Sequence, residues 1–375
     1  MNLHFMLDEK VISRTISYFE EALPQENKYI ILTDNPSHPK FVTGQYKNCY
    51  RLKYDSNEFW AVIGDVSSYS SIITHYLSGW AVRFINKIEH NRIILIFWGA
   101  DLYNGLLKPK GYKLFYNERD VNKLLRTDKS FIQIIKGAIM RRHIYRNTIQ
   151  AVYKVRYICA FKGELELLVK YYPNLRTITP KDFFYYPIDD IVPDALKGVQ
   201  KLGDDIVVGN SASFFGNHEE VFLQLSSINT RGRKIMVPLS YGAPSVIKYI
   251  KEKGKNILGD SFVPILNFMP LEEYNRFLCG ARTFIYGNYR QEAFGNIVIA
   301  LFLGGAVFLH PSNILLKELK DMGCICFSTN ELQEKIHYYL ADKEKLNNRN
   351  VIQKRYNIQR LLNIIKTEFS TNGVD

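Results

Sequence analysis

The segment RIILIFWGAD, residues 92–101, decides the fold class of this chain. A run rich in Ile and Leu is typical of a strand buried on both faces, as in a parallel sheet covered by helices. The run stops at Trp98, Gly99 and Asp101, and Tyr103 follows closely. Ligands of open parallel sheets bind beyond the carboxyl ends of the strands, so this stop makes Asp101 a candidate site residue. The alternative is that Trp98 fills a seam between domains and Asp101 caps the next helix.

Strands and helices alternate on both sides of this segment. In the first half we expect strands at 2–6, 29–32, 92–98 and 157–161, helices at 9–22, 70–88 and 164–171, and an apolar stretch at 183–186 that could close the sheet. In the second half we expect strands at 205–208, 234–239, 283–286, 306–309 and 325–327, and helices at 218–226, 245–253, 271–279, 296–303, 314–322 and 331–340. This alternation predicts an α/β protein.

The length of 375 residues favours two domains. We expect a first Rossmann-like domain at 1–190, a linker at 191–204 with weak periodicity, and a second Rossmann-like domain at 205–345. Residues 346–375 hold a further amphipathic helix at 350–367, which we expect to pack back on the first domain. The two domains would face each other across a cleft.

Composition excludes several classes of protein. Hydrophobic residues make up 46% and charged residues 23%, which is typical of a soluble globular protein. The five cysteines show no CxxC spacing, which fits a reducing cytoplasm, and the N-terminus does not resemble a signal peptide. No apolar run reaches the roughly 20 residues of a membrane span. The chain has no DxD, HxH or HExxH spacing, so we expect a metal-independent protein without a cofactor.

Positive charge is concentrated in one segment. The chain carries a net charge of +12, and residues 108–156 hold 13 Lys and Arg against 3 Asp and Glu. Within this segment, residues 131–158 predict a basic amphipathic helix that contacts an anionic membrane surface through Lys136, Arg141, Arg142 and Arg146. The alternatives are a solvated helix face and a nucleic-acid surface. No RNP, zinc-finger or helix-turn-helix signature accompanies the charge, so we expect no nucleic-acid partner.

The best candidate anion site begins after the strand at 205–208. Gly209, Asn210 and Ser211 follow this strand, and a helix opens near Asn217. Glycine permits close approach of the backbone to a ligand, and a helix N-terminus offers free N–H groups to phosphate. Asn217 has a competing interpretation as a simple helix cap.

A second strand end carries a similar pattern. The strand at 283–286 is followed by Arg290, Gln291 and Glu292, and an apolar helix opens at Gly295 and Asn296. Arginine can bind a diphosphate with two parallel hydrogen bonds, and the neighbouring amide and carboxylate can bind sugar hydroxyls. The alternative for Arg290 is a surface salt bridge. A third loop, with Ser240 and Tyr241, follows the strand between these two sites.

Four segments resemble a known family in sequence and in order. They are FWGADLYNGLLKPKGYKLFYNERD (97–120), IVVGNSASFFGNHEEV (206–221), IMVPLSYGAPSVIKYIKEKG (235–254) and YRQEAFGNIVIALFLGGAVFLHPSN (289–313). They are similar to the bacterial 4-acetamido-4,6-dideoxygalactosyltransferases of enterobacterial common antigen synthesis, a resemblance that covers residues 90–330. It implies a GT-B fold, a TDP-activated deoxyamino sugar as donor, and an undecaprenyl-diphosphate-linked saccharide as acceptor. It also implies peripheral attachment to the cytoplasmic face of the bacterial inner membrane.

Carried over by position, the resemblance assigns roles to the candidate residues. It places Trp98, Gly99, Asp101 and Tyr103 on the acceptor side. Glu292, Ala293 and Phe294 depart from the family pattern, and Ser240 stands where glycine is common. The residues that would bind the donor are Gly209, Asn210, Ser211, Asn217, His218, Ser240, Tyr241, Arg290, Gln291, Glu292, Gly295 and Asn296.

The expected reaction is transfer of a deoxyamino hexose in common-antigen or O-antigen synthesis. Asp101 is the candidate general base if the anomeric centre is inverted. If it is retained, Asp101 would orient the acceptor. The alternatives are a GT-B transferase that uses another UDP or GDP sugar, and a catalytically idle nucleotide-sugar-binding module.

Overall fold

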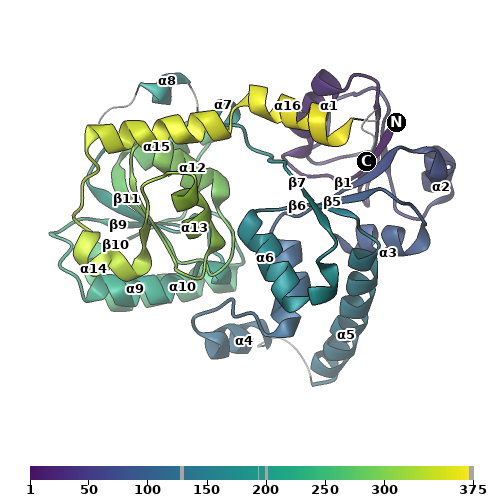
Figure 1. Cartoon of the computed structure of the whole chain (residues 1–375). Helices are drawn as coiled ribbons and strands as arrows, with labels where there is room; N and C mark the ends of the chain where they lie inside the picture. The colour runs from purple at the N-terminus through teal and green to yellow at the C-terminus, as the bar shows by residue number, and fades with distance from the viewer. Residues whose placement is uncertain (127–130, 193, 199–201, 371–375) are drawn as a thin grey trace. The chain divides into compact units, whose positions relative to one another are not determined.

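Two parallel sheets organise the computed structural model, which describes residues 1–126, 131–192, 194–198 and 202–370 (Figure 1). Unit 1 comprises Met1–Tyr112, Phe131–Pro187 and Ile358–Asp375, and unit 2 comprises Lys113–Ser130 and Ile188–Asn357. The sequence predicts that 113–130 belongs to the first domain and that 191–204 is a linker. In the structure, the short helices α7 (Ile188–Ile191) and α8 (Asp194–Lys197) lie at the start of the predicted linker.

Unit 1 is built on a seven-stranded parallel sheet in the order β3-β2-β1-β4-β5-β6-β7. The strand order reverses between β1 and β4, the topological switch point of a Rossmann-like sheet. The strands are β1 (Asn2–Leu7), β2 (Asn27–Leu32), β3 (Cys49–Leu52), β4 (Ser71–His75), β5 (Ile93–Ile96), β6 (Tyr157–Cys159) and β7 (Thr179–Lys181).

Helices cover both faces of this sheet, which explains the continuous apolar strands. The α-helices of unit 1 are α1 (Ile12–Ala22), α2 (Asn57–Ile63), α3 (Gly79–Lys87), α5 (Phe131–Tyr153), α6 (Lys162–Tyr171) and α16 (Ile358–Phe369). Short turns η1 (Val66–Ser68), η3 (Lys108–Lys110) and η4 (Pro173–Leu175) and the π-helix η2 (Asp101–Leu107) complete the unit. α1 and α16 lie side by side on one face (Figure 1). On the other face, Phe5 of β1 packs against Phe59 and Phe84.

Several elements of unit 1 differ from the sequence prediction. The expected helix at 70–88 is wrong in its first part, because SIITH forms β4, a strand buried on both faces. The helix begins only after Ser78, whose hydroxyl accepts a hydrogen bond from the Ala81 N–H. The stretch 183–186 does not close the sheet, since the short β7 does. Phe183, Phe184 and Tyr185 instead pack against the core. The sequence prediction also lacked β3 and α2.

Unit 2 is built on a six-stranded parallel sheet in the order β10-β9-β8-β11-β12-β13. Its strands are β8 (Asp205–Val208), β9 (Ile235–Pro238), β10 (Phe262–Ile265), β11 (Ala281–Tyr286), β12 (Ala306–Leu309) and β13 (Phe327–Ser328). This is again the Rossmann order, and its switch point lies between β8 and β11. The prediction of an α/β protein with two Rossmann-like sheets is therefore confirmed.

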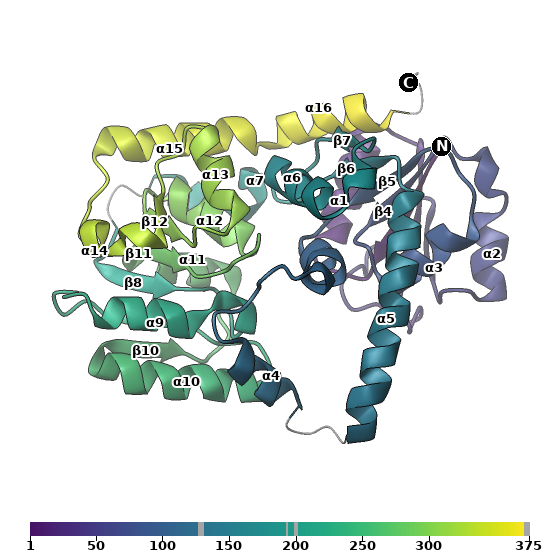
Figure 2. The ribbon, with the colours of Figure 1, turned by 60° about the horizontal axis from the view of Figure 1, so that its bottom comes forward.

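Helices also cover both faces of the second sheet. α9 (His218–Ser226) and α10 (Pro244–Leu258) lie side by side on one face, while α12 (Phe294–Phe302) and α15 (Asp342–Arg355) lie on the other (Figure 2). The remaining α-helices are α4 (Glu118–Arg126), α11 (Leu271–Cys279), α13 (Ile314–Asp321) and α14 (Leu332–Lys335). Short turns are η5 (Phe214–Gly216), η6 (Gly259–Ser261) and η7 (Thr329–Glu331).

The C-terminal half departs from prediction at three places. The sequence prediction lacked β10, and the expected helix at 331–340 is only η7 and α14. The expected single helix at 350–367 is two helices, α15 and α16, which are separated at Tyr356 and Asn357. The Tyr356 carbonyl accepts a hydrogen bond from the Ile188 N–H at 2.6 Å, and the Tyr356 ring packs against Phe294. These tertiary contacts interrupt a sequence that is apolar at helical spacing.

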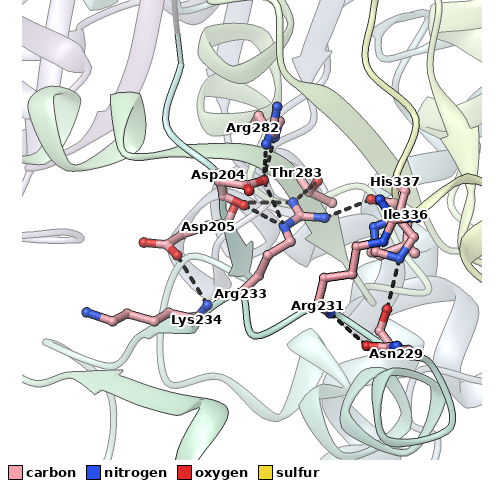
Figure 3. Close-up of polar contacts among 10 residues, drawn as sticks. All are labelled: Asp204, Asp205, Asn229, Arg231, Arg233, Lys234, Arg282, Thr283, Ile336 and His337. Atoms are coloured by element: carbon pink, nitrogen blue, oxygen red, sulfur yellow. Dashed lines mark hydrogen bonds and ion pairs between the residues drawn. The ribbon is translucent and has the colours of Figure 1, made fainter.

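A buried arginine ties together the amino edge of the second sheet (Figure 3). Arg233 precedes β9 and donates hydrogen bonds to the carbonyl of Asp204, the hydroxyl of Thr283 and the carbonyl of Ile336. Its guanidinium also pairs with the Asp204 carboxylate at 3.3 Å. Arg233 therefore connects the starts of β8, β9 and β11 with the segment after α14.

Candidate functional site

In unit 2, three loops follow adjacent strands at the carboxyl edge of the sheet. The loops after β8 and β9 are joined by a parallel bridge between Ala212 and Gly242, where the Ala212 N–H donates to the Tyr241 carbonyl at 3.0 Å. The loop after β11 approaches the loop after β8, because a Cβ on Gly287 would lie 2.7 Å from the Gly216 carbonyl oxygen. The sequence-predicted residues Gly209, Ser240 and Arg290 thus belong to one edge of one sheet.

Gly209 is required by both conformation and packing. Its φ of 70° lies in the left-handed region, and its N–H donates to the Ile285 carbonyl at 2.9 Å. A Cβ there would lie 2.6 Å from Nε2 of His218, and a Cβ on Gly216 would lie 2.5 Å from Cε1 of the same ring. The imidazole of His218 is therefore packed against two glycines beneath the loop.

His218 is a neutral group at physiological pH. Its side chain is buried, and burial lowers the pKa of His218 to about 4, against a smaller opposite effect of a hydrogen bond with the Ser213 backbone. Its ring nitrogens find no other hydrogen-bond partner among the described residues. The resemblance predicts that His218 faces the donor diphosphate, and this role stays a prediction. In this environment the ring packs against the loop and carries no positive charge.

Asn217 connects three segments of unit 2. Its amide nitrogen donates to the carbonyls of Leu114 at 3.2 Å and Gly287 at 3.1 Å, and its amide oxygen accepts from the Tyr116 N–H at 2.8 Å. It precedes α9, but its side chain makes no capping hydrogen bond. Asn217 therefore fastens residues 114–116 and the loop after β11 to the loop after β8.

Arg290 is fixed in place before any ligand binds. Its Nε donates to Glu292 at 3.1 Å, and its guanidinium lies 3.9 Å from the centroid of the Phe215 ring. Glu292 also accepts from the amide of Asn288 at 3.1 Å. A side chain held this way loses little conformational entropy on binding an anion. Phe215 itself stacks on Phe115 of the segment that Asn217 fastens.

Other polar side chains along this edge remain available to a ligand. The α12 helix opens at Phe294, one residue before the predicted Gly295, and Tyr241 is exposed. Within the described residues, no hydrogen bond is made by the side chains of Asn210, Ser211, Ser240, Gln291 and Asn296, all of which are partly buried. The described residues contain no cluster of three or more His, Cys, Asp or Glu that could hold a metal ion.

In unit 1, Asp101 lies at the carboxyl edge of the sheet, as the first residue of η2. Its carboxylate accepts hydrogen bonds from the N–H groups of Leu77 at 2.8 Å, Trp98 at 3.0 Å and Leu102 at 3.1 Å. Burial raises the pKa of Asp101 to about 6, although these backbone hydrogen bonds lower it. Asp101 thus ties the loop after β4 to the loop after β5, and it keeps a pKa suited to a base at neutral pH.

Aromatic side chains surround the carboxyl end of β5. β5 ends at Ile96, two residues before the predicted Trp98. The Trp98 ring packs between Tyr76, with centroids 5.3 Å apart, and Tyr185, at 5.6 Å. Tyr76 has a φ of 75°, an unusual value for a residue with a bulky side chain. Gly99 also has a positive φ of 89°, and Tyr103 is fully buried and contributes to the core.

Sequence reasoning missed a buried polar chain at the switch point of unit 1. Asn27 Oδ1 contacts His4 Nε2 at 3.1 Å, His4 Nδ1 contacts His75 Nε2 at 3.1 Å, and His75 Nδ1 contacts Tyr185 Oη at 2.8 Å. Because the side-chain oxygen of Asn27 accepts a hydrogen bond from His4 Nε2, the direction of the other two hydrogen bonds is fixed. His75 Nε2 donates to His4 Nδ1, and the Tyr185 hydroxyl donates to His75 Nδ1. The histidines lie within apolar strands, where sequence offers no signal that they meet.

Glu9 is a second missed residue at this switch point. It follows β1 in FMLDEK, an abrupt stop of an apolar run like that at Trp98. Its neighbour Asp8 accepts hydrogen bonds from the N–H groups of Phe41 at 2.9 Å and Val42 at 2.8 Å. Glu9 is partly buried, and its side chain makes no hydrogen bond within the described part of the chain.

The basic segment forms a helix that ends at Tyr153, five residues before the predicted end. Lys136, Arg141, Arg142 and Arg146 are all exposed. Two apolar side chains among them, Met140 and Ile144, are 58% and 53% exposed. The side chains of Ile135 and Ile139, two further apolar residues of this helix, lie outside the described residues. No helix in the described part of the chain is long and apolar enough to cross a bilayer.

Comparison with solved structures shows the fold. The chain is similar to sucrose-phosphate synthase from Thermosynechococcus elongatus, with 12% identity, 98% of each chain covered and a TM-score of 0.65. It is also similar to HepE from Anabaena in complex with UDP-glucose, with 11% identity, 98% and 99% covered and a TM-score of 0.61. A glycosyltransferase from Rickettsia africae matches with 13% identity, 99% of each chain covered and a TM-score of 0.59.

At these identities the likeness shows the fold alone, and the predicted GT-B fold is confirmed. No protein-family model matches this chain. No curated protein matches it either.

Proposed function

We propose that this chain is a glycosyltransferase that binds a nucleotide-sugar donor at the carboxyl edge of the unit 2 sheet. The observation that carries the proposal is the switch point between β8 and β11, where Gly209, the prepositioned Arg290 and the start of α12 occupy the loops of neighbouring strands. Backbone N–H groups and an arginine are the groups that bind diphosphate. HepE, which shares the fold, has been solved with UDP-glucose.

The donor residues divide into two groups. We assign contact with the nucleotide sugar to Gly209, Asn210, Ser211, Ser240, Tyr241, Gln291, Gly295 and Asn296, and to Arg290, whose buried guanidinium is held by Glu292 and Phe215. Asn217, His218 and Glu292 hold the loops and Arg290 in position, since their side chains are buried or engaged with neighbouring protein groups. Arg290 and the N-terminus of α12 would balance the diphosphate charge without a metal ion.

From the sequence resemblance, we propose a TDP-linked deoxyamino hexose as donor, 4-acetamido-4,6-dideoxygalactose or a close relative. The acceptor would be an undecaprenyl-diphosphate-linked saccharide of common-antigen or O-antigen synthesis. The exposed Met140 and Ile144 among exposed arginines of α5 support peripheral binding to the cytoplasmic face of the inner membrane. Trp98, Gly99 and Tyr103 would shape the acceptor side in unit 1.

Two carboxylates are candidates for the general base of an inverting reaction. Asp101 has a pKa of about 6, but its oxygens accept three backbone hydrogen bonds. Glu9 lies at the switch point, and its side chain makes no hydrogen bond to any described residue. If Asp101 is the base, D101N lowers kcat by about a hundredfold or more, whereas E9Q does not. A large loss in E9Q alone assigns the base to Glu9, and Asp101 is then a structural tie.

A thermal-shift panel with TDP, UDP and GDP tests the donor class. Because a ligand stabilises the state that binds it, we expect TDP to raise the unfolding temperature by a few degrees and the others to raise it less. R290Q should abolish the shift, whereas R282Q, which removes an arginine at the opposite edge of the same sheet, should keep it. No response to any nucleotide contradicts the proposal. Nucleotide binding without transfer to a lipid-linked acceptor supports an idle binding module.

A further inference from the structure

Unit 1 contains a pocket of about 540 Å³ between α3, η2 and α5. The wall from α3 includes Gly79 and Arg83, and that from η2 includes Gly105. α5 contributes Met140 and Ile144. The volume lies within the range of sites for small organic ligands. Nothing in the donor chemistry of unit 2 accounts for this pocket.

One part of the pocket wall favours an anion. Gly79 is the first residue of α3, so the positive end of that helix dipole opens here. Arg83 follows one turn later; its Nε donates to the Gly79 carbonyl at 3.3 Å and its guanidinium lies 4.9 Å from the centroid of the Tyr54 ring, so an anion would bind its terminal nitrogens. His143 Nε2 lies 3.0 Å from the amide nitrogen of Asn147, which leaves Nδ1 as the donor of the ring. The lining contains one acid, Asp101, which is 5% exposed and whose oxygens face backbone N–H groups.

Another part of the wall is apolar and reaches the surface. Leu77 and Val82 are buried there, whereas Met140 and Ile144 of α5 are more than half exposed at its rim. Exposed large apolar side chains beside a concave site indicate an apolar ligand or a membrane surface. The exposed Arg141, Arg142 and Arg146 follow on the same helix. If only a phosphate bound here, the apolar wall would stay exposed to water.

We infer that this pocket binds the phosphorylated end of an isoprenoid lipid, with the phosphate or diphosphate at Arg83 and the α3 N-terminus and the first isoprene units along Met140 and Ile144. This inference deepens the proposed function and rests on it, because it assigns the lipid end of the acceptor to a place in unit 1. The sugar bonded to that diphosphate would then lie toward Asp101, which lines the same pocket.

Calorimetric titration of the full chain with farnesyl diphosphate, inorganic diphosphate and farnesol tests this inference. We expect farnesyl diphosphate to bind at least about tenfold more tightly than either fragment, because it contacts both parts of the wall. R83Q should weaken its binding by about tenfold. The control is K87Q, which removes the same charge one turn along α3, where Lys87 pairs with Asp55 at 2.8 Å outside the pocket.

A second variant fills the pocket. A Cβ on Gly105 would meet no atom within 4 Å, so G105F is expected to fold and to place its ring in the pocket. It should abolish binding of farnesyl diphosphate, and unchanged hydrogen exchange in α3 and β5 would show that unit 1 is intact. Unchanged binding in G105F or R83Q overturns the inference, as does equal binding of inorganic diphosphate.

The controls separate this inference from the proposed function. If nucleotides stabilise the protein but farnesyl diphosphate does not bind, only the pocket assignment fails. If nucleotides have no effect and farnesyl diphosphate binds through Arg83, the donor proposal fails and the pocket stands. Vesicles of phosphatidylglycerol provide the last comparison. If G105F loses vesicle binding as strongly as farnesyl diphosphate binding, the pocket takes phospholipid headgroups, which contradicts the isoprenoid assignment.

Discussion

At the scale of single residues, buried polar groups carry the properties that sequence alone did not reveal. His4 and His75 lie inside the unit 1 sheet in direct contact, and His218 lies beneath the unit 2 loops. Burial lowers the pKa of His4 to about 3, against the opposite effect of the Asn27 hydrogen bond. Burial, together with the proximity of His4, also lowers the pKa of His75 well below its usual value. Each histidine is therefore neutral in the folded protein at physiological pH.

The stability of unit 1 should fall as the solution is acidified. Because the folded-state pKa of His4 is depressed, the unfolded chain takes up a proton below pH 6.5 while the folded chain does not until about pH 3. The free energy of unfolding should therefore drop by about 2 kcal/mol from pH 7 to pH 5 for this one histidine. In urea unfolding experiments between pH 7 and pH 5, H4Q should reduce the slope of the free energy of unfolding against pH. The exposed His38 provides the control H38Q, and a slope that H4Q leaves unchanged would contradict this assignment.

At the scale of elements, loops and sheet edges are held by a few side chains that bridge several strands. Asn217 fastens residues 114–116 to the donor loops, and Asp101 joins the loops after β4 and β5. Sequence analysis singled out both residues as site candidates, since both follow strand ends. Their hydrogen bonds also fasten the loops at the sheet edges, a contribution that depends on segments far away along the chain, and their roles toward a ligand stay predictions.

Arg233 should stabilise unit 2 strongly. R233A leaves the carbonyl of Ile336 and the hydroxyl of Thr283 without this donor inside the protein, so we expect a loss of about 3 kcal/mol in the free energy of unfolding. K234A, at the neighbouring exposed position, should change it by less than about 0.5 kcal/mol. Denaturant unfolding measures the loss in the free energy of unfolding, and hydrogen exchange in β8 and β11 shows where protection is lost. Equal stability of the two variants would show that Arg233 is dispensable.

At the scale of the whole molecule, the first and last helices of the chain pack together within one unit. α16 packs on α1, and Phe369 lies 5.3 Å from Phe19 between ring centroids. Leu361, Ile365 and Phe369 of this last helix are buried in the unit 1 core. Residues 113–126 and 188–357, in contrast, contribute to unit 2. Unit 1 is thus assembled from three separate stretches of sequence.

The last helix should therefore determine the stability of unit 1. Ile365 is fully buried against α1, so I365A should lower the free energy of unfolding of unit 1 by about 3 kcal/mol. L346A, which truncates an exposed leucine on α15, should have little effect. Hydrogen exchange resolved by segment should show faster exchange in α1 and β1 for I365A and unchanged exchange in β8 and β9. Loss of protection in both units would contradict a separate core.

The fold class and most of the elements could be predicted from the sequence. Apolar runs such as 93–96 and 205–208, and the helix start at His218, are local patterns that the folded chain keeps. The sequence also located the strand ends at which we propose that ligands bind. Tertiary structure alone decided that SIITH is a strand, that 350–367 breaks at Tyr356, that His4 meets His75, and that α3, η2 and α5 enclose a pocket. The physical reason is that periodicity reports which side of an element is buried, whereas contacts between residues distant in sequence depend on how the elements pack.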